Sequence, residues 1–402
     1  MNVVGRATAA AASLTVLVVL AVLAADAVLV FPASAQAARR SAPPPDAGLA
    51  LPAPTGRSLV GATTLDLLDR RRADPWRPAV RRELMVTLWY PAGARTRRLL
   101  AYTTPEVSAG VLGSMGVARS SWPGVLSAVR THSYVDAPPA GSPGRRPLVL
   151  LSPGFGMPRS SLTALGEDLA SRGYVVAGVD HTYEAAGVQF PDGRFAGCVP
   201  CSSTDPERFG KVIRGRREDL SFVLDRLTGA HPAWSGAGII DSSRVGMAGH
   251  SIGGAAALAT LQTDRRVRAG LDLDGTLLPP RHEVRRPFLL VGSDVHGMPG
   301  TDGSWEASWA ELTGWKKWLR LAGAGHLTFT DWGLLAEGLG VRRQLPPDSA
   351  AEQYGTIGSA RGLRITRAYV AAFFDAKLRG ERAPLLTGPS RAYPEISFKV
   401  PR

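Results

Sequence analysis

The feature that most constrains the fold is a short Gly-His-Ser-Ile-Gly motif at residues 249–253. A strand-like run, 244–248, precedes it, and an Ala-rich stretch that favours helix, 255–261, follows it. In such a sharp turn from strand to helix, the central residue, Ser251, adopts strained backbone angles and is presented at the edge of a sheet. Glycine is needed on both sides because a β-carbon there would collide with the neighbouring strand or helix. The motif therefore predicts that Ser251 is a nucleophile on an α/β sheet.

A second glycine-containing loop, Ser-Pro-Gly-Phe-Gly at 152–156, directly follows a continuous apolar run at 147–151. Transfer of an acyl group to a serine requires two N–H donors that stabilise the negative charge on the carbonyl oxygen. The backbone N–H groups of Phe155, in this loop, and of Ile252, at the predicted helix start, are the expected donors. The helix N-terminus adds its own positive partial charge at Ile252.

The general base is expected to be a histidine late in the chain, because this strand–turn–helix arrangement places nucleophile, acid and histidine in that order. His326 follows a strand-like run, 317–321, in the Gly-rich loop Ala-Gly-Ala-Gly-His. Two carboxylates compete for the role of the acid that orients the histidine. Asp274 and Asp294 each end a strand-like segment, and the residues alone leave the choice between them open.

Apolar runs alternate with helical patterns along most of the chain, which predicts an α/β fold with a mostly parallel central sheet flanked by helices. The expected strands are 84–90, 147–151, 174–179, 244–248, 267–273, 288–291 and 318–321, and the expected helices are 160–171, 209–227, 255–261 and 365–378. No internal repeat or long interior linker divides the chain, so residues 57–390 are expected to form one catalytic domain. The pattern leaves open whether 94–146 or 183–206 forms a lid over the site.

The N-terminus has the features of an export signal. Arg6 precedes an uncharged Ala-, Leu- and Val-rich run, 7–25, and A-x-A cleavage patterns follow at 33–35 and 35–37. Residues 1–37 are therefore expected to be a signal peptide, with an uncleaved membrane anchor as the alternative. Pro- and Ala-rich residues 38–56 are interpreted as a linker and 391–402 as a C-terminal tail. We expect the protein to be secreted or located in the cell envelope.

The two cysteines, Cys198 and Cys201, are separated by two residues in a Gly- and Pro-rich segment. In an exported chain this spacing predicts a local disulfide. A zinc site would need further ligands, and no second C-x-x-C pair occurs, so neither a metal nor an organic cofactor is expected.

The formal net charge of +13 comes mostly from scattered arginines. This distribution does not favour nucleic-acid binding, which would require a basic stripe interleaved with aromatic residues. It leaves room for peripheral contact with an anionic lipid surface. The sequence does not define the oligomeric state.

Several short stretches together resemble the platelet-activating-factor acetylhydrolase group (plasma and type II) of the α/β-hydrolases. They are Arg82-Glu83-Leu84-Met85-Val86, Trp89-Tyr90-Pro91, Leu151-Ser152-Pro153-Gly154-Phe155-Gly156, Asp168-Leu169-Ala170-Ser171-Arg172-Gly173-Tyr174, Gly249-His250-Ser251-Ile252-Gly253-Gly254 and Leu273-Asp274-Gly275-Thr276-Leu277-Leu278-Pro279. The similarity extends from about residue 80 to about residue 335. The Ser-Pro-Gly-Phe stretch also resembles cutinase-like polyester hydrolases.

Both resemblances favour Asp274 as the acid. The acetylhydrolase group takes its acid from an L-D-x-x-x-x-P context, which matches Asp274, whereas the acid position of the cutinase-like enzymes is occupied here by His296. The sequence departs from the acetylhydrolase pattern at Pro153, where that group usually has histidine, and in the segment with the two cysteines.

The resemblance implies a serine carboxylesterase of the α/β-hydrolase fold that hydrolyses short or truncated acyl esters, with glycerophospholipids as candidate substrates. A lipase or a cutinase-like polyester hydrolase is the alternative enzyme. The alternative outside enzymology is an envelope or membrane-surface binding protein built on a hydrolase fold.

Overall fold

The computed structural model describes residues 48–400 except 117–123, 142–143 and 206. The predicted signal peptide, 1–37, lies outside the described residues. In the part of the chain that is described, no helix is long and apolar enough to cross a membrane.

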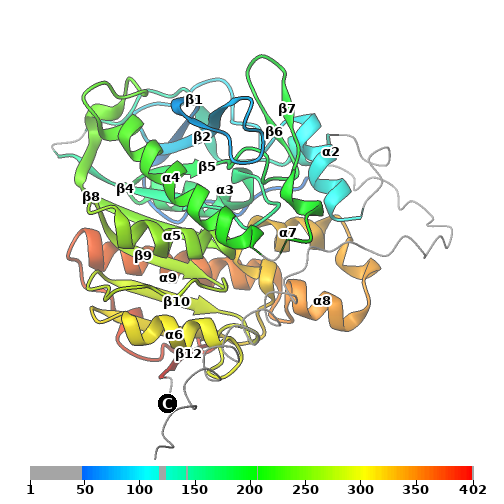
Figure 1. Cartoon of the computed structure of the whole chain (residues 1–402), viewed down its shortest axis with the longest axis vertical. Helices are drawn as coiled ribbons and strands as arrows, with labels where there is room; N and C mark the ends of the chain where they lie inside the picture. Colours follow the sequence, from blue (N-terminus) through cyan, green and yellow to red (C-terminus); the bar gives the residue numbers. More distant parts are fainter. Residues whose placement is uncertain (1–47, 117–123, 142–143, 206, 401–402) are drawn as a thin grey trace, which may run out of the picture.

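A ten-stranded sheet forms the centre of the molecule, in the order β12-β11-β10-β9-β8-β4-β5-β2-β1-β3 (Figure 1). Its strands are β1 (Leu59–Ala73), β2 (Arg81–Ala92), β3 (Ser133–Val135), β4 (Arg146–Ser152), β5 (Val175–Val179), β8 (Ile240–His250), β9 (Val267–Leu273), β10 (Phe288–Gly292), β11 (Lys316–Leu321) and β12 (Ile396–Lys399). Six neighbouring strands pair in parallel: β11, β10, β9, β8, β4 and β5. At the two ends of this group, β12 pairs antiparallel with β11, and β2 pairs antiparallel with β5.

Helices cover both faces of the sheet. The helices that pack on the sheet are α3 (Thr163–Ser171), α4 (Arg208–Thr228), α5 (Ile252–Thr263), α6 (Gly303–Glu311) and α9 (Ser359–Leu378). Three more, α2 (Pro105–Ser114), α7 (Asp331–Gly338) and α8 (Pro347–Tyr354), share a separate apolar cluster. Alternate residues of β4 enter different apolar clusters: Leu148 and Leu150 pack in the cluster with α4 and α5, and Val149 and Leu151 in the cluster with α3 and α9. Because side chains alternate along a strand, a run that is apolar at every position is buried on both faces. The predicted α/β-hydrolase fold is thus confirmed.

Residues 48–56, which composition assigned to a linker, pack against the domain. Leu51 is 2% exposed, and the backbone N–H of Thr55 donates to Asp168 at 2.8 Å. The Arg367 guanidinium donates to the carbonyl oxygens of Pro52 and Ala53. The Pro- and Ala-rich composition reflects an irregular but anchored backbone, so the linker interpretation was wrong for these residues.

The predicted C-terminal tail, 391–402, contains the last strand of the sheet. β12 pairs with β11, and its Ile396 is 3% exposed. The pattern also missed β1, where charged residues stand beside apolar ones because one face of this strand is open to solvent.

The two poorly patterned stretches contain short elements that lie side by side. The first contains α2, and the second contains a small hairpin of β6 (Val188–Gln189) and β7 (Phe195–Ala196). They are in close contact, since a β-carbon on Gly110 would lie 2.5 Å from the carbonyl oxygen of Ala186. Figure 1 shows α2, β6, β7, α7 and α8 gathered at one end of the sheet.

Candidate active site

Ser251 occupies the sharp turn between β8 and α5. Its backbone angles, φ 56° and ψ −132°, fall outside the regions that ordinary residues prefer. A β-carbon on Gly249 would lie 2.0 Å from the backbone of Gly253, and one on Gly253 would lie 2.1 Å from the carbonyl oxygen of Ser152. The two glycines of the motif are therefore required by close approach of strand, helix and loop.

Asp274 and His326 meet next to this turn. Asp274 follows β9, and its Oδ1 accepts the N–H of Ser293 at 2.6 Å while its Oδ2 lies 2.8 Å from Nδ1 of His326. The histidine follows β11 and begins a short 3₁₀ helix, His326–Phe329. Asp274 is buried, and the His326 side chain is 24% exposed.

The electrostatics of this pair fix the histidine tautomer. Burial alone would raise the pKa of Asp274, but His296, His326 and the Ser293 amide lower this pKa well below its ordinary 3.8. An ionised carboxylate only accepts hydrogen bonds, so Nδ1 of His326 carries the proton. The other ring nitrogen, Nε2, is then unprotonated and able to act as a base. In a serine triad, the acid orients the histidine in this way.

The other candidate acid, Asp294, lies at the surface. Its side chain is 49% exposed and pairs with Arg320 at 2.5 Å. The chain thus brings Asp274, and not Asp294, to His326.

A cavity of about 990 Å³ contains Ser251 and His326 in its lining, at the carboxyl ends of the central strands. Its walls come from α2, the 183–206 segment and the start of α4, so both poorly patterned stretches contribute to the enclosure of the site. The apolar lining includes Phe155, Phe195, Phe209, Leu277, Val295 and Trp332. Cys198 and Cys201 form a disulfide in this wall.

Phe155 and Ile252, the predicted oxyanion donors, also line the cavity. Among the described residues, neither backbone N–H donates a hydrogen bond to another group of the protein. Ile252 is the first residue of α5, so its N–H has no partner within the helix. The two donors are thus available to a ligand.

His250 is a site residue whose role the sequence did not reveal. It is fully buried, and its Nε2 donates to the carbonyl oxygen of His326 at 2.8 Å. On its other side it packs against the 152–156 loop, since a β-carbon on Gly154 would lie 2.7 Å from Nδ1 of His250. Burial and the neighbouring His326 lower the pKa of His250 from 6.5 to about 3, so the ring is neutral. As the variable position of the motif, it carried no signal in the sequence.

A hydrogen-bonded Ser-His-Asp arrangement lies outside the cavity lining. Ser152 Oγ lies 3.0 Å from Nε2 of His181, and Nδ1 of His181 lies 2.9 Å from Asp219. Each of the three residues is at most 1% exposed, and none lines the cavity. No substrate can reach Ser152 in this arrangement, so Ser251 is the serine with the geometry of a nucleophile.

The side chains of Asp274, His296 and His326 bring ligand-type atoms within 4.8 Å of one another, a spacing compatible with a bound cation. However, Nδ1 of His296 bonds Asp302 at 2.8 Å, as Nδ1 of His326 bonds Asp274. These two hydrogen bonds orient both imidazole rings, an arrangement that suits proton transfer by Nε2 of His326.

Comparison with known proteins places this chain in a family. The family model for platelet-activating factor acetylhydrolase, isoform II, matches residues 53–191 and 235–378. A probable 1-alkyl-2-acetylglycerophosphocholine esterase from Arthroderma benhamiae is 30% identical over 373 residues, which span 87% of this chain and 93% of the relative.

Two bacterial hydrolases are also similar. The structure of a ferulic acid esterase from Streptomyces cinnamoneus superposes with a TM-score of 0.80 at 48% identity, covering 88% of this chain and 99% of that one. A bis(hydroxyethyl) terephthalate hydrolase from Streptomyces coelicolor is 33% identical over 158 residues, 39% of this chain and 42% of the relative. The chain belongs to the isoform II family of platelet-activating factor acetylhydrolases, and it is a carboxylic ester hydrolase.

Proposed function

We propose that this protein is an exported serine carboxylesterase in which Ser251 is the nucleophile, His326 the general base and Asp274 the acid. The observation that carries the proposal is the bond of 2.8 Å between Nδ1 of His326 and Asp274, beside a strained Ser251 on the wall of the same cavity. This arrangement leaves Nε2 of the histidine free to take a proton.

In the first half-reaction, Oγ of Ser251 attacks the ester carbonyl carbon and its proton passes to Nε2 of His326. The N–H groups of Phe155 and Ile252 hold the resulting oxyanion. The intermediate collapses, the alcohol leaves with the proton from Nε2, and the acyl group stays on Ser251. Water then attacks this acyl-enzyme with the same histidine as base, releasing the acid and restoring Ser251.

We propose short or truncated acyl esters as substrates, with glycerophospholipids as the natural class. The Arthroderma relative, a probable 1-alkyl-2-acetylglycerophosphocholine esterase, supports this choice because the match spans most of both chains. The net charge of +13 would help the enzyme to dock on an anionic lipid surface that presents such esters.

A second candidate substrate class is the ester of a bulky aromatic acid. The aromatic side chains Phe155, Phe195, Phe209 and Trp332 in the cavity wall favour it, as does the 48% identity to a ferulic acid esterase. Flat aromatic rings pack well against such side chains.

Hydrolysis of p-nitrophenyl esters from acetyl to dodecanoyl, together with methyl ferulate, separates these candidates. The proposal predicts the highest kcat/KM for the shortest acyl groups and no measurable turnover by Ser251→Ala. A rate that rises with chain length would indicate a lipase or cutinase-like enzyme, and a preference for methyl ferulate would indicate the aromatic class. Vesicle binding without turnover of any ester, equal in wild type and Ser251→Ala, would instead indicate a surface-binding protein.

Export is part of the proposal. The charged and apolar pattern of residues 1–37 supports it, and so does the Cys198–Cys201 disulfide, because disulfides persist in oxidising compartments. Sequencing the N-terminus of the protein recovered outside the cytoplasm should locate the new end near residues 35–38. Full-length protein retained in the cytoplasm would contradict export.

A further inference from the structure

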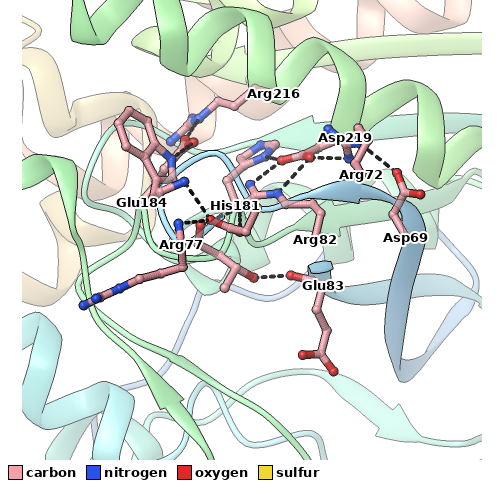
Figure 2. Close-up of polar contacts among 12 residues, drawn as sticks. Asp69, Arg72, Arg77, Arg82, Glu83, His181, Glu184, Arg216 and Asp219 are labelled. Carbon is pink, nitrogen blue, oxygen red and sulfur yellow. Dashed lines mark hydrogen bonds and ion pairs between the residues drawn. The ribbon is translucent and has the colours of Figure 1, made fainter. Parts of the chain in front are cut away.

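A buried ion-pair network lies directly behind the 152–156 loop. Figure 2 shows Asp219 bonded to His181, Arg82 and Arg72, with Arg216 and Glu184 beside this cluster. Arg82, Arg216, Glu184 and Asp219 are each at most 1% exposed. None of these residues has one of the three catalytic roles proposed above. Their polar groups instead contact the 152–156 loop.

Arg216, on α4, holds the loop by two backbone carbonyls. One terminal nitrogen donates to the carbonyl of Pro153 at 2.5 Å, and the other lies 3.4 Å from the carbonyl of Gly154. Its Nε donates to Glu184 at 2.7 Å. The guanidinium therefore uses its planar fork on three acceptors at once, which the single ammonium of lysine cannot match.

These contacts, together with the N–H of Met157, which donates to the Gly154 carbonyl at 3.2 Å, set the direction of the oxyanion donor. The peptide bonds of the described residues are all trans, and in a trans peptide the N–H points opposite to the carbonyl of the preceding residue. Because the Gly154 carbonyl faces Arg216, the N–H of Phe155 faces away from it. Phe155 lines the cavity and Arg216 does not, so an N–H of Phe155 that points away from Arg216 is compatible with a donor that faces the cavity.

Glu184 and His181 fix the two ends of the same loop. The carbonyl of Glu184 accepts the N–H of Gly156 at 2.9 Å, and its carboxylate also accepts Nε1 of Trp76 at 2.8 Å. At the other end, Ser152 Oγ bonds to His181, whose pKa burial and Arg216 lower to about 3. A neutral ring that donates from Nδ1 to Asp219 accepts the Ser152 hydroxyl at Nε2.

A contribution to folding stability alone does not explain why a buried ion pair such as Arg216 and Glu184 is present. Apolar residues of similar volume often replace buried ion pairs at no loss of stability. We propose that Arg216 is a positioning residue for the oxyanion hole, which fixes the 152–156 loop so that the Phe155 N–H points at the substrate carbonyl. The inference rests on the proposed function, in which this N–H is one of two oxyanion donors.

The variant Arg216→Lys tests the inference in the full protein. Loss of the fork leaves the Gly154 carbonyl bonded only to the N–H of Met157, at 3.2 Å, and loosens the Gly154–Phe155 peptide. We therefore expect kcat for p-nitrophenyl acetate to fall about 10- to 100-fold, because one well-placed oxyanion donor contributes about 10²–10³ in kcat. KM should change less than about twofold, since the donor acts mainly in the transition state. Affinity for a trifluoromethyl ketone, which forms a tetrahedral oxyanion on serine, should fall in the same proportion as kcat/KM.

Arg367→Lys is a matched control. Arg367 is also buried, pairs with Asp168 and donates to two backbone carbonyls, but it lies outside the cavity lining. The variant Arg367→Lys should lower the melting temperature about as much as Arg216→Lys does. It should leave kcat within about twofold of the wild-type value. An equal loss of kcat in both variants, or a normal kcat in folded Arg216→Lys, would overturn the inference.

The double variant Arg216→Met, Glu184→Met covers the case in which Arg216→Lys does not fold. It removes both charges, so no unpaired charge stays buried. The same fall in kcat with unchanged KM is expected, and a normal kcat would contradict the inference. Wild-type turnover and its loss in Ser251→Ala are measured alongside, so failure of the proposed function is recognised separately.

Discussion

At the scale of single residues, local patterns in the sequence were sufficient to propose some of the candidate site residues. Ser251 and Ile252 could be proposed because the glycines, the strand and the helix all lie between residues 244 and 261. Asp274 could not be separated from Asp294 by such patterns, since both end strands. His250 and Arg216 were missed because their partners, His326 and the 153–154 carbonyls, lie more than 60 residues away.

The choice of acid leads to a direct prediction. Asp274→Asn keeps the shape of the side chain but removes the charge that fixes the His326 tautomer, so kcat should fall about 10³-fold or more. Asp294→Asn, which affects only a surface pair with Arg320, should keep kcat within about twofold. Comparable losses in the two variants, from steady-state kinetics at pH 7.5, would rule out Asp274 as the sole acid.

The buried neutral His250 predicts a pH dependence of stability. Its pKa is about 3 in the folded protein and about 6.5 when unfolded, so between these values the unfolded state binds one more proton. The folded state therefore loses about 1.4 kcal/mol per pH unit from this group as the pH falls below 6.5.

His250→Gln removes that proton from the balance. Urea unfolding at pH 6, 5 and 4 gives the slope of the free energy of unfolding against pH. This slope should be steeper for the wild type than for the variant by about 1.4 kcal/mol per pH unit, which corresponds to one bound proton. Parallel slopes for the two proteins would mean that His250 is not buried in its neutral form.

At the scale of elements, the central parallel strands were predicted from their continuous apolar runs, while the edges of the sheet were not. β4 and β5 are buried on both faces and left a clear signal. The edge strand β12 has only four residues, three of them half-buried, so its pattern resembles a tail. Pairing across the sheet, which the local pattern does not encode, decides its structure.

Removal of β12 tests its role in the sheet. A chain that ends at Tyr393 loses the buried Ile396 and exposes the edge of β11, so the free energy of unfolding should fall by about 2–4 kcal/mol. A chain that ends at Val400 is the control and should match the full protein in urea unfolding. Equal stability of both truncated chains would show that residues 394–400 act only as a tail.

At the scale of the whole molecule, segments far apart in sequence build one cavity. Its lining includes residues from α2, the 183–206 segment, the start of α4 and the loops after β4, β8, β9, β10 and β11. The lining residues are spread along the chain from Gly110 to Gln353, so no local pattern reports the size or the aromatic character of the pocket. The chemistry was therefore predictable from the sequence, whereas the shape that selects the ester was not.

The whole fold also holds two serines close to a His-Asp pair: Ser251 faces the cavity that His326 lines, and Ser152 is buried against His181. Ser251 lines the cavity, and Ser152 is 1% exposed behind it. Only the open serine should react with an electrophile that mimics an ester.

Labelling with a fluorophosphonate, followed by peptide mass spectrometry, tests the central claim most directly. We predict one adduct per chain, on Ser251, with loss of esterase activity in proportion to labelling and no adduct in Ser251→Ala. An adduct on Ser152 or another residue, or full activity after complete labelling of Ser251, would contradict the assignment of Ser251 as the nucleophile.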